Sequence, residues 1–172
     1  MKKLFILILL ILLVLSGCSS DTIKTQLYQG KNLVIGVIGN APVVREDNIR
    51  FETIGFNDLE KVGDLSSEFD AILIMKEHLS EASEAKYAKV YKDSGIPFFF
   101  IESEKSYIPF IEEDILYEEV PEVKDQTYAT GYFQSGEKGE YWGYGLYNDK
   151  VNESNIQDVY SRIFSTIESI RK

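Results

Sequence analysis

Leu33-Val34-Ile35-Gly36-Val37-Ile38 is an uninterrupted apolar run, and two similar runs follow it, Ala71-Ile72-Leu73-Ile74-Met75 and Pro97-Phe98-Phe99-Phe100-Ile101. Short runs that are apolar at every position, and rich in β-branched and aromatic residues, are typical of parallel strands covered on both faces by helices. Arg50-Phe51-Glu52-Thr53-Ile54 instead alternates polar and apolar residues, as a strand exposed on one face does. The four segments predict an α/β fold with three central strands and one edge strand.

Helical patterns accompany these strands. Ser80 is a candidate N-cap for a helix that runs to Asp93, between the second and third apolar runs. Near the C-terminus, apolar residues recur at three- and four-residue spacing over 156–170, which predicts a long amphipathic helix. Ser154 and Gln157 have the spacing of a capping box at the start of that helix.

The alternation of strands and helices implies a parallel sheet with right-handed crossovers. With the alternating segment 50–54 at the edge, the simplest strand order is 2-1-3-4, as in flavodoxin-like and Rossmann-like domains. The segments Tyr128 to Phe133 and Tyr141 to Tyr147 predict an antiparallel hairpin joined across 135–139. We therefore expect a three-layer α/β domain with a mostly parallel sheet, an added hairpin and a C-terminal helix.

The first eighteen residues have a different character from the rest. Met1-Lys2-Lys3 precedes an apolar run from Leu4 to Leu15, which ends at Ser16-Gly17-Cys18. A positive start, an apolar stretch of roughly 7–15 residues and small residues after it are the features of a secretory signal peptide. The run is shorter than the roughly 20 apolar residues that a membrane-spanning helix needs. Leu15-Ser16-Gly17-Cys18 resembles the lipobox of bacterial lipoproteins.

This resemblance, which covers only about the first twenty residues, implies cleavage before Cys18 and a diacylglyceryl anchor on its sulfur. Such cleavage would remove a signal peptide (1–17). The polar, weakly periodic stretch after it predicts a lipidated tether (18–31) that leads to a single α/β domain (32–172). The resemblance also implies a lipid-anchored protein on the extracytoplasmic face of a cell membrane. The lysine- and isoleucine-rich composition favours a Gram-positive source. No family motif marks the globular domain.

Charge and composition exclude several partners and cofactors. The formal net charge is −10, and loss of Lys2 and Lys3 with the signal peptide leaves 16 basic against 28 acidic residues, a charge of −12. Such a surface repels nucleic acid and anionic lipid head groups. A single histidine and a single, acylated cysteine exclude the usual zinc sites. No dinucleotide fingerprint or phosphate-binding loop is present, so we expect no cofactor and no metal.

Candidate ligand-binding residues follow the predicted strands. In open α/β sheets, ligands bind beyond the carboxyl ends of the strands where the strand order reverses, here between the first and third strands. The residues at these positions are Asn40, Lys76, Glu77, His78, Glu102 and Ser103. Together they suit a small polar or anionic molecule, and a histidine beside a carboxylate can act as a general base near neutral pH. The alternative is that these are ordinary surface side chains, since loops after strands are polar in every α/β domain.

An acidic stretch lies between the fourth strand and the hairpin; it contains Glu112, Glu113, Asp114, Glu118, Glu119 and Glu122. Carboxylate oxygens suit calcium, but the spaced ligands and central glycine of an EF-hand loop are absent. The pattern therefore favours a solvated loop.

The second hairpin strand combines tyrosines with glycines. Tyr141 and Tyr147 share one predicted face with Gly143 and Gly145, and strand glycines often mark close approach by a ligand or another backbone. The two rings could stack on sugar rings or pack on a partner protein. The alternative is that a helix, such as the C-terminal one, covers the glycines. Trp142, Tyr144 and Leu146 alternate with these residues and are predicted to face the core.

These features favour a non-catalytic, membrane-anchored lipoprotein that binds a small molecule, a cell-wall component or a protein partner. An exported, hydrolase-like enzyme working around His78 is the second interpretation. A single-lobe solute-binding protein is the third, although solute receptors are ordinarily larger and two-lobed.

Overall fold

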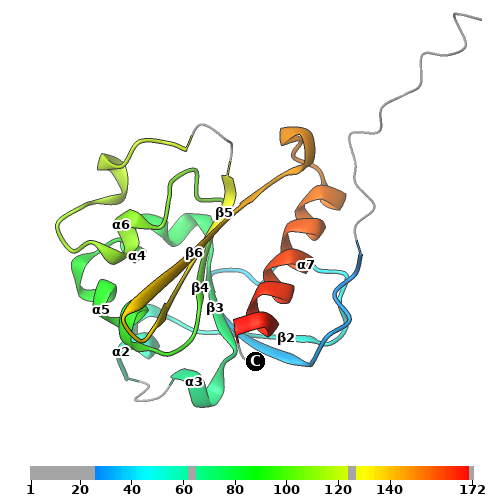
Figure 1. Ribbon diagram of the computed structural model, residues 1–172, viewed down its shortest axis with the longest axis horizontal. Coiled ribbons are helices and arrows are strands. Elements are labelled where there is room, and N and C mark those ends of the chain that lie inside the picture. The colour runs from blue at the N-terminus through cyan, green and yellow to red at the C-terminus, as the bar shows by residue number, and fades with distance from the viewer. Residues whose placement is uncertain (1–25, 62–64, 124–126, 171–172) are drawn as a thin grey trace, which may run out of the picture.

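The computed structural model describes residues 26–61, 65–123 and 127–170, so the predicted signal peptide and Cys18 lie outside the described residues. Its centre is a six-stranded sheet with the order β2-β1-β3-β4-β5-β6 (Figure 1). The strands are β1 (Leu33–Ile38), β2 (Ile49–Thr53), β3 (Ala71–Ile74), β4 (Phe98–Ile101), β5 (Thr127–Ser135) and β6 (Lys138–Gly145). The first four are parallel, and β5 and β6 run antiparallel to their neighbours.

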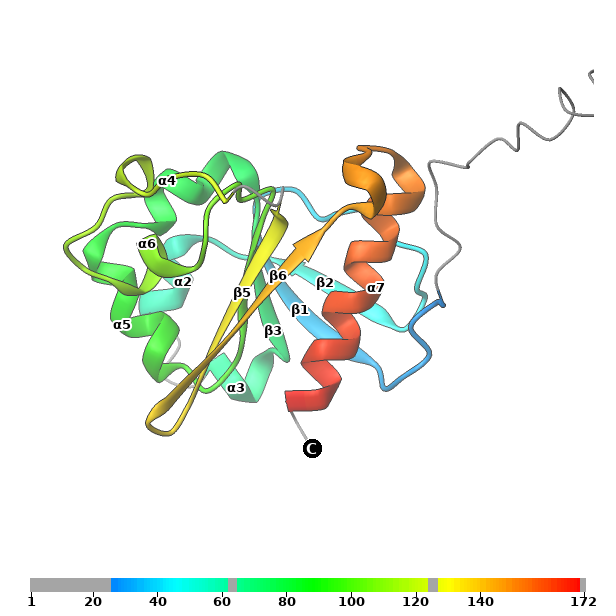
Figure 2. The same cartoon turned by 45° about the horizontal axis from the view of Figure 1, so that its top comes forward.

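Helices cover both faces of this sheet (Figure 2). One face carries the short elements α2 (Phe56–Lys61), α3 (Leu65–Glu68), η1 (Lys76–His78), α4 (Leu79–Ala82), α5 (Ala85–Asp93) and α6 (Ile108–Ile111). The other face carries α7 (Glu153–Ile170), and the 3₁₀ turns η2 (Tyr117–Glu119) and η3 (Tyr147–Asp149) lie in the connections. No helix in the described ranges is long and apolar enough to cross a membrane.

The predicted α/β class and the C-terminal helix are confirmed. The predicted sheet is confirmed only in part. The order 2-1-3-4 is present, but the sheet continues into the antiparallel strands β5 and β6 and is therefore mixed. β2 lies at one edge, as its alternating sequence predicts. The hairpin turn is tighter than expected, because it needs only Gly136-Glu137 and Gly136 supplies a φ of 59°.

Two apolar layers lie on either side of the sheet. In β4, Phe98 and Phe100 join the cluster under the short helices, whereas Phe99 and Ile101 join the cluster under α7. All four side chains are fully buried. The run predicted as a central strand therefore supplies both layers by simple alternation.

The single helix predicted from Ser80 to Asp93 is interrupted. Ser80 lies inside α4, and the chain turns at Ser83 and Glu84 before α5 begins. The Ser83 hydroxyl donates a hydrogen bond to the Ser80 carbonyl oxygen (2.9 Å) and accepts one from the Tyr117 N–H (3.2 Å). The predicted helix is therefore interrupted at Ser83, whose hydroxyl binds both the backbone of α4 and the first residue of η2.

The N-terminus of α7 also differs from the predicted capping box at Ser154 and Gln157. The helix begins at Glu153, and the Asn152 Oδ1 accepts a hydrogen bond from the Asn155 N–H (3.0 Å). Asparagine is among the preferred N-cap residues, so Asn152 is the cap. Gln157 instead donates to Glu153 Oε1 (3.0 Å), within the first turn.

Tyr28 belongs to the folded domain, although the sequence places residues 18–31 in a tether. Its side chain is 5% exposed, and its ring meets Phe164 of α7 edge-on at a centroid distance of 6.0 Å. Its N–H donates a hydrogen bond to the buried carboxylate of Glu46 (3.2 Å). The folded part therefore begins ahead of the predicted boundary at residue 32.

Two hairpin glycines differ in what surrounds them. A Cβ added at Gly131 would lie 2.7 Å from two ring atoms of Phe99, whereas one added at Gly143 would meet nothing closer than 3.7 Å. We therefore expect Gly131→Ala to lower the free energy of unfolding by about 1–3 kcal/mol through overpacking. Gly143→Ala is expected to be neutral or to stabilise by a few tenths of a kcal/mol through the unfolded chain. Urea unfolding of the two variants measures this difference, and equal effects would contradict the packing described for Gly131.

Candidate functional site

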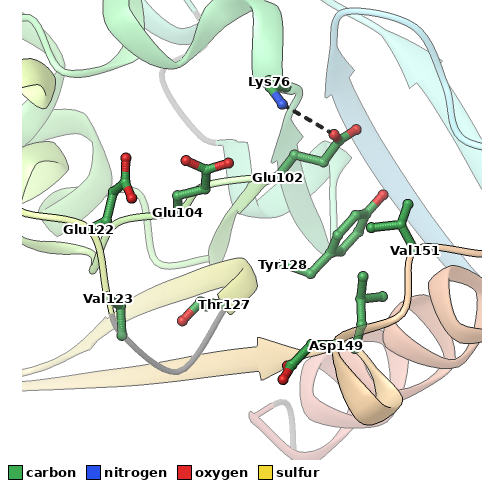
Figure 3. Close-up of a pocket in the computed structure, with 10 residues that line it drawn as sticks. Lys76, Glu102, Glu104, Glu122, Val123, Thr127, Tyr128, Asp149 and Val151 are labelled. Atoms are coloured by element: carbon green, nitrogen blue, oxygen red, sulfur yellow. Dashed lines mark ion pairs between the residues drawn. The ribbon is translucent and has the colours of Figure 1, made fainter.

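A cavity of about 400 Å³ opens at the edge of the sheet where β3 and β4 end and the hairpin begins and ends (Figure 3). This is within the range of small-molecule sites, roughly 300–1,000 Å³. Its lining combines carboxylates, one ammonium group, a tyrosine and aliphatic side chains. The residues are Lys76, Glu102, Glu104, Glu122, Val123, Thr127, Tyr128, Leu146, Asp149 and Val151.

One wall is made by two loops that are tied together. The Lys105 Nζ donates a hydrogen bond to the Val120 carbonyl oxygen (2.7 Å), and the Val123 N–H donates to the Glu104 carbonyl oxygen (2.8 Å). The Lys105 ammonium also lies 4.8 Å from the centroid of the Tyr117 ring. These contacts hold the loop after β4 against the end of the acidic stretch, so that Glu104 and Glu122 face one cavity.

The opposite wall is fixed by the N-terminus of α7. Asn155 is fully buried, and its Nδ2 donates to the carbonyl oxygens of Tyr147 (3.1 Å) and Lys150 (2.9 Å). These bonds hold η3 over the strand ends. Asp149, at the end of this turn, and Val151, just after it, therefore line the cavity (Figure 3).

The backbone is strained at this site. Among the described residues, the non-glycine residues with positive φ are Glu102 (54°), Asn148 (49°) and Asp149 (53°). Asparagine and aspartate adopt this conformation more readily than most residues, but glutamate does so rarely. Two of the three residues line the cavity and the third adjoins it. Such conformations persist only where the surrounding structure holds them, and they are concentrated at ligand-binding and active sites.

The charges around the cavity are unequal. The Lys76 Nζ lies 3.6 Å from Glu102 Oε2, and both side chains are about half exposed. Glu104, Glu122 and Asp149 add three further carboxylates without a second basic residue in the described lining. At neutral pH the lining thus carries four negative charges and one positive charge, which favours a cation.

Tyr128 contributes a neutral hydroxyl beside these charges. Burial, followed by the negative charge of Glu102, raises the pKa of Tyr128 to about 12, although a hydrogen bond with Tyr160 of α7 acts in the opposite direction. Burial and the neighbouring Tyr128 likewise raise the pKa of Tyr160. Tyr128 therefore stays protonated at neutral pH and can donate or accept a hydrogen bond.

The structure brings only part of the predicted ligand-binding set together. Lys76 and Glu102 line the cavity. The remaining four do not: Asn40 is exposed, Glu77 lies beside Gly39, His78 meets the Phe56 ring edge-on at 6.2 Å, and Ser103 is fully buried. The Ser103 Oγ closes its own loop by donating to the Lys105 carbonyl oxygen (3.0 Å).

The acidic stretch divides into several roles. Glu118 Oε1 accepts a hydrogen bond from the Ser80 hydroxyl (2.7 Å), which lowers the pKa of Glu118, and Glu119 Oε2 accepts one from the Leu116 N–H (3.1 Å). Glu122 lines the cavity. Within the part of the chain that the structure describes, no three acidic, histidine or cysteine side chains are grouped so as to hold a metal ion.

Tyr141 and Tyr147 do not lie on the same strand, contrary to what the sequence predicted. Tyr141 is 63% exposed and stacks at 4.5 Å on Tyr107, whereas Tyr147 lies beyond β6 in η3. Helix α7 packs on the other side of β6, against Tyr144 and Trp142, as the predicted core face requires. A role for the two tyrosines in binding a wall component or a protein stays a prediction.

Most of the cavity lining was not identified from the sequence. Tyr128, Leu146, Asp149 and Val151 come from segments assigned only to the hairpin or to its connections. The one available signal was the density of acidic residues before the hairpin, which includes Glu122.

Comparisons of this chain with protein-family models, curated proteins and solved structures gave no match.

The raised pKa of Tyr128 predicts a pH effect on stability. The folded state holds the phenolic proton up to about pH 12, whereas the unfolded chain releases it near pH 10, so this contribution is complete below pH 10 and is lost as the pH rises through 12. We expect Tyr128→Phe to lose less stability between pH 10 and 12 than the unmodified chain in urea unfolding. Tyr147→Phe is the control and should follow the unmodified chain. Parallel curves for Tyr128→Phe and the unmodified chain would contradict the assignment.

Proposed function

We propose that this chain is a lipid-anchored, extracytoplasmic binding protein that takes a small organic cation into the cavity at the end of β4. The observation that carries the proposal is the lining itself, with four carboxylates, one ammonium group and a cavity of about 400 Å³. A concave site with one predominant charge sign concentrates ligands of the opposite sign. The ligand class therefore differs from the small polar or anionic molecule that the sequence favoured.

The apolar part of the lining supports an organic ligand. Val123, Leu146 and Val151, together with the Tyr128 ring, give the cavity a substantial apolar surface. Small-molecule sites typically combine such a surface with a few polar groups that fix orientation. An amine or a guanidinium compound with a short hydrocarbon part matches both features.

The position of His78 favours binding over hydrolysis. Its ring meets Phe56, on the side of the sheet covered by the short helices, and is not part of the cavity lining. The cavity has Glu102 beside Lys76 and a neutral tyrosine, which are groups that bind and orient a ligand. We therefore retain the non-catalytic interpretation.

Ligand binding can be measured as a shift in the thermal unfolding of the full chain purified in detergent. Cadaverine, agmatine and choline are the cationic probes; acetate, phosphate and Ca²⁺ complete the panel. A cation present at a hundred times its Kd stabilises the folded state by about 2.7 kcal/mol, a shift of several degrees for a domain of this size. We expect stabilisation by at least one organic cation and none by the anions. Stabilisation by Ca²⁺ alone, or by no cation, would contradict the proposal.

The double variant Glu104→Gln/Glu122→Gln tests whether the cation is attracted by the carboxylates of the cavity or by the net charge of the whole protein. Two exposed carboxylates together contribute on the order of 1.4 kcal/mol, so we expect about a tenfold weaker affinity for the cation. Glu113→Gln/Glu137→Gln makes the same change in net charge at exposed positions outside the cavity and should leave the affinity unchanged. Equal effects would mean that only the overall charge attracts the cation.

The lipid anchor has its own test. Cys18 is the only cysteine, so Cys18→Ser should abolish incorporation of labelled palmitate in a bacterial host. Ser19→Ala, next to it, is the control and should stay labelled. Label on Cys18→Ser, or no label on the unmodified chain, would contradict the proposed anchor.

A further inference from the structure

We infer that the ligand of this cavity is a basic α-amino acid, with its α-carboxylate on Lys76, its α-ammonium on Glu102 and its side-chain cation among the remaining carboxylates. This inference rests on the proposed function and makes it narrower. It starts from the one positive group in an otherwise acidic lining, because Lys76 would repel a ligand that carried positive charge alone.

Lys76 and Glu102 are arranged to exchange partners. Their charged atoms lie 3.6 Å apart, with side-chain exposures of 60% and 42%, so the ion pair is weak and open to solvent. An α-amino acid carries an ammonium and a carboxylate on the same carbon. It can therefore replace this single pair by two, one to each protein group, without leaving either charge unpartnered.

Glu102 is held in place for such a contact. Its backbone has a φ of 54°, and the buried Ser103 that follows it closes the loop through hydrogen bonds with Lys105. The Tyr128 hydroxyl is close enough for Glu102 to raise its pKa, and stays protonated at neutral pH. Glu102 directly follows β4 and Tyr128 belongs to β5, so both groups at the end of the cavity that receives the α-carbon are positioned by the sheet.

The other side of the cavity suits a second cation. In the view of Figure 3, Glu104 and Glu122 lie on one side of the cavity, and the Tyr128 ring and Val151 lie on the other. Their two loops are joined by the hydrogen bond from the Val123 N–H to the Glu104 carbonyl oxygen. A short aliphatic chain can run between these groups along Val123 and Leu146 and place its terminal ammonium or guanidinium beside the carboxylates.

Three compounds of similar length test the two charges on the α-carbon of the ligand. L-lysine has all three charges, cadaverine lacks the carboxylate, and 6-aminohexanoate lacks the α-ammonium. Calorimetric titration of the full chain in detergent is expected to show L-lysine binding at least tenfold more tightly than either analogue. Equal affinity for L-lysine and cadaverine would overturn this inference and leave the proposed function intact. No heat from L-lysine at millimolar concentration would also overturn this inference, and no heat from cadaverine, agmatine or choline as well would overturn the proposed function.

Variants assign the carboxylate contact to Lys76. Lys76→Met should reduce the affinity for L-lysine about tenfold and leave the affinity for cadaverine unchanged or higher. A variant that failed to fold would instead lose affinity for both compounds. Lys86→Met is the matched control, since Lys86 also forms an exposed ion pair, with Glu84 (3.1 Å), and lies outside the cavity. An unchanged preference for L-lysine over cadaverine in Lys76→Met would overturn the assignment.

Discussion

The burial of both faces of β4 is the constraint on which the rest of the structure depends. Phe98 and Phe100 point to one side and Phe99 and Ile101 to the other, and water reaches none of them. Phe100 stacks on Phe110 at 3.5 Å, while Phe99 lies against Tyr144 at 6.1 Å. Because each buried phenylalanine contributes about 1.5–3 kcal/mol, leaving either face uncovered would cost most of the stability of a domain this size. The sheet must therefore be the middle layer, which places α5 and α6 on one side and α7 on the other.

Strand positions follow from local composition, and the structure agrees with them closely at β1, β3 and β4. What local patterns miss are places where one side chain serves two elements. Ser83 occurs in a stretch that is helical by propensity, but its hydroxyl also accepts the Tyr117 N–H from 34 positions along the chain. Asn152 lies one residue before α7 and four residues before the apolar stripe, so periodicity alone gives no reason to prefer it to Ser154 as a cap. The Ser83 contact forms only once the chain has folded, whereas the Asn152 cap is a local contact that hydrophobic periodicity does not reveal.

Local sequence patterns predict even less of the candidate site than of the fold. The rule that ligands bind beyond the ends of parallel strands points to the edge of the sheet at which the cavity lies, and Lys76 and Glu102, which it selects, line that cavity. It places the crevice between β1 and β3, whereas the cavity lies where the hairpin joins β4. Pairing of β5 with β4 brings Tyr128 beside Glu102, and the left-handed turn at Asn148 and Asp149 brings η3 over the strand ends. Neither the partner of a hairpin nor a left-handed pair of residues is visible in composition or periodicity.

The contact between β1 and α7 determines when this layer of the core can form. Leu33, Ile35 and Val37 share one apolar cluster with Ile163 and Phe164, so the first strand synthesised is covered by the last helix. More than a hundred residues separate them, and the sheet cannot complete this layer until nearly the whole chain is available. A partly made chain thus lacks a finished core and stays open. Covering this face of the sheet therefore requires both β1 and α7, so a substitution in either element weakens the same apolar layer.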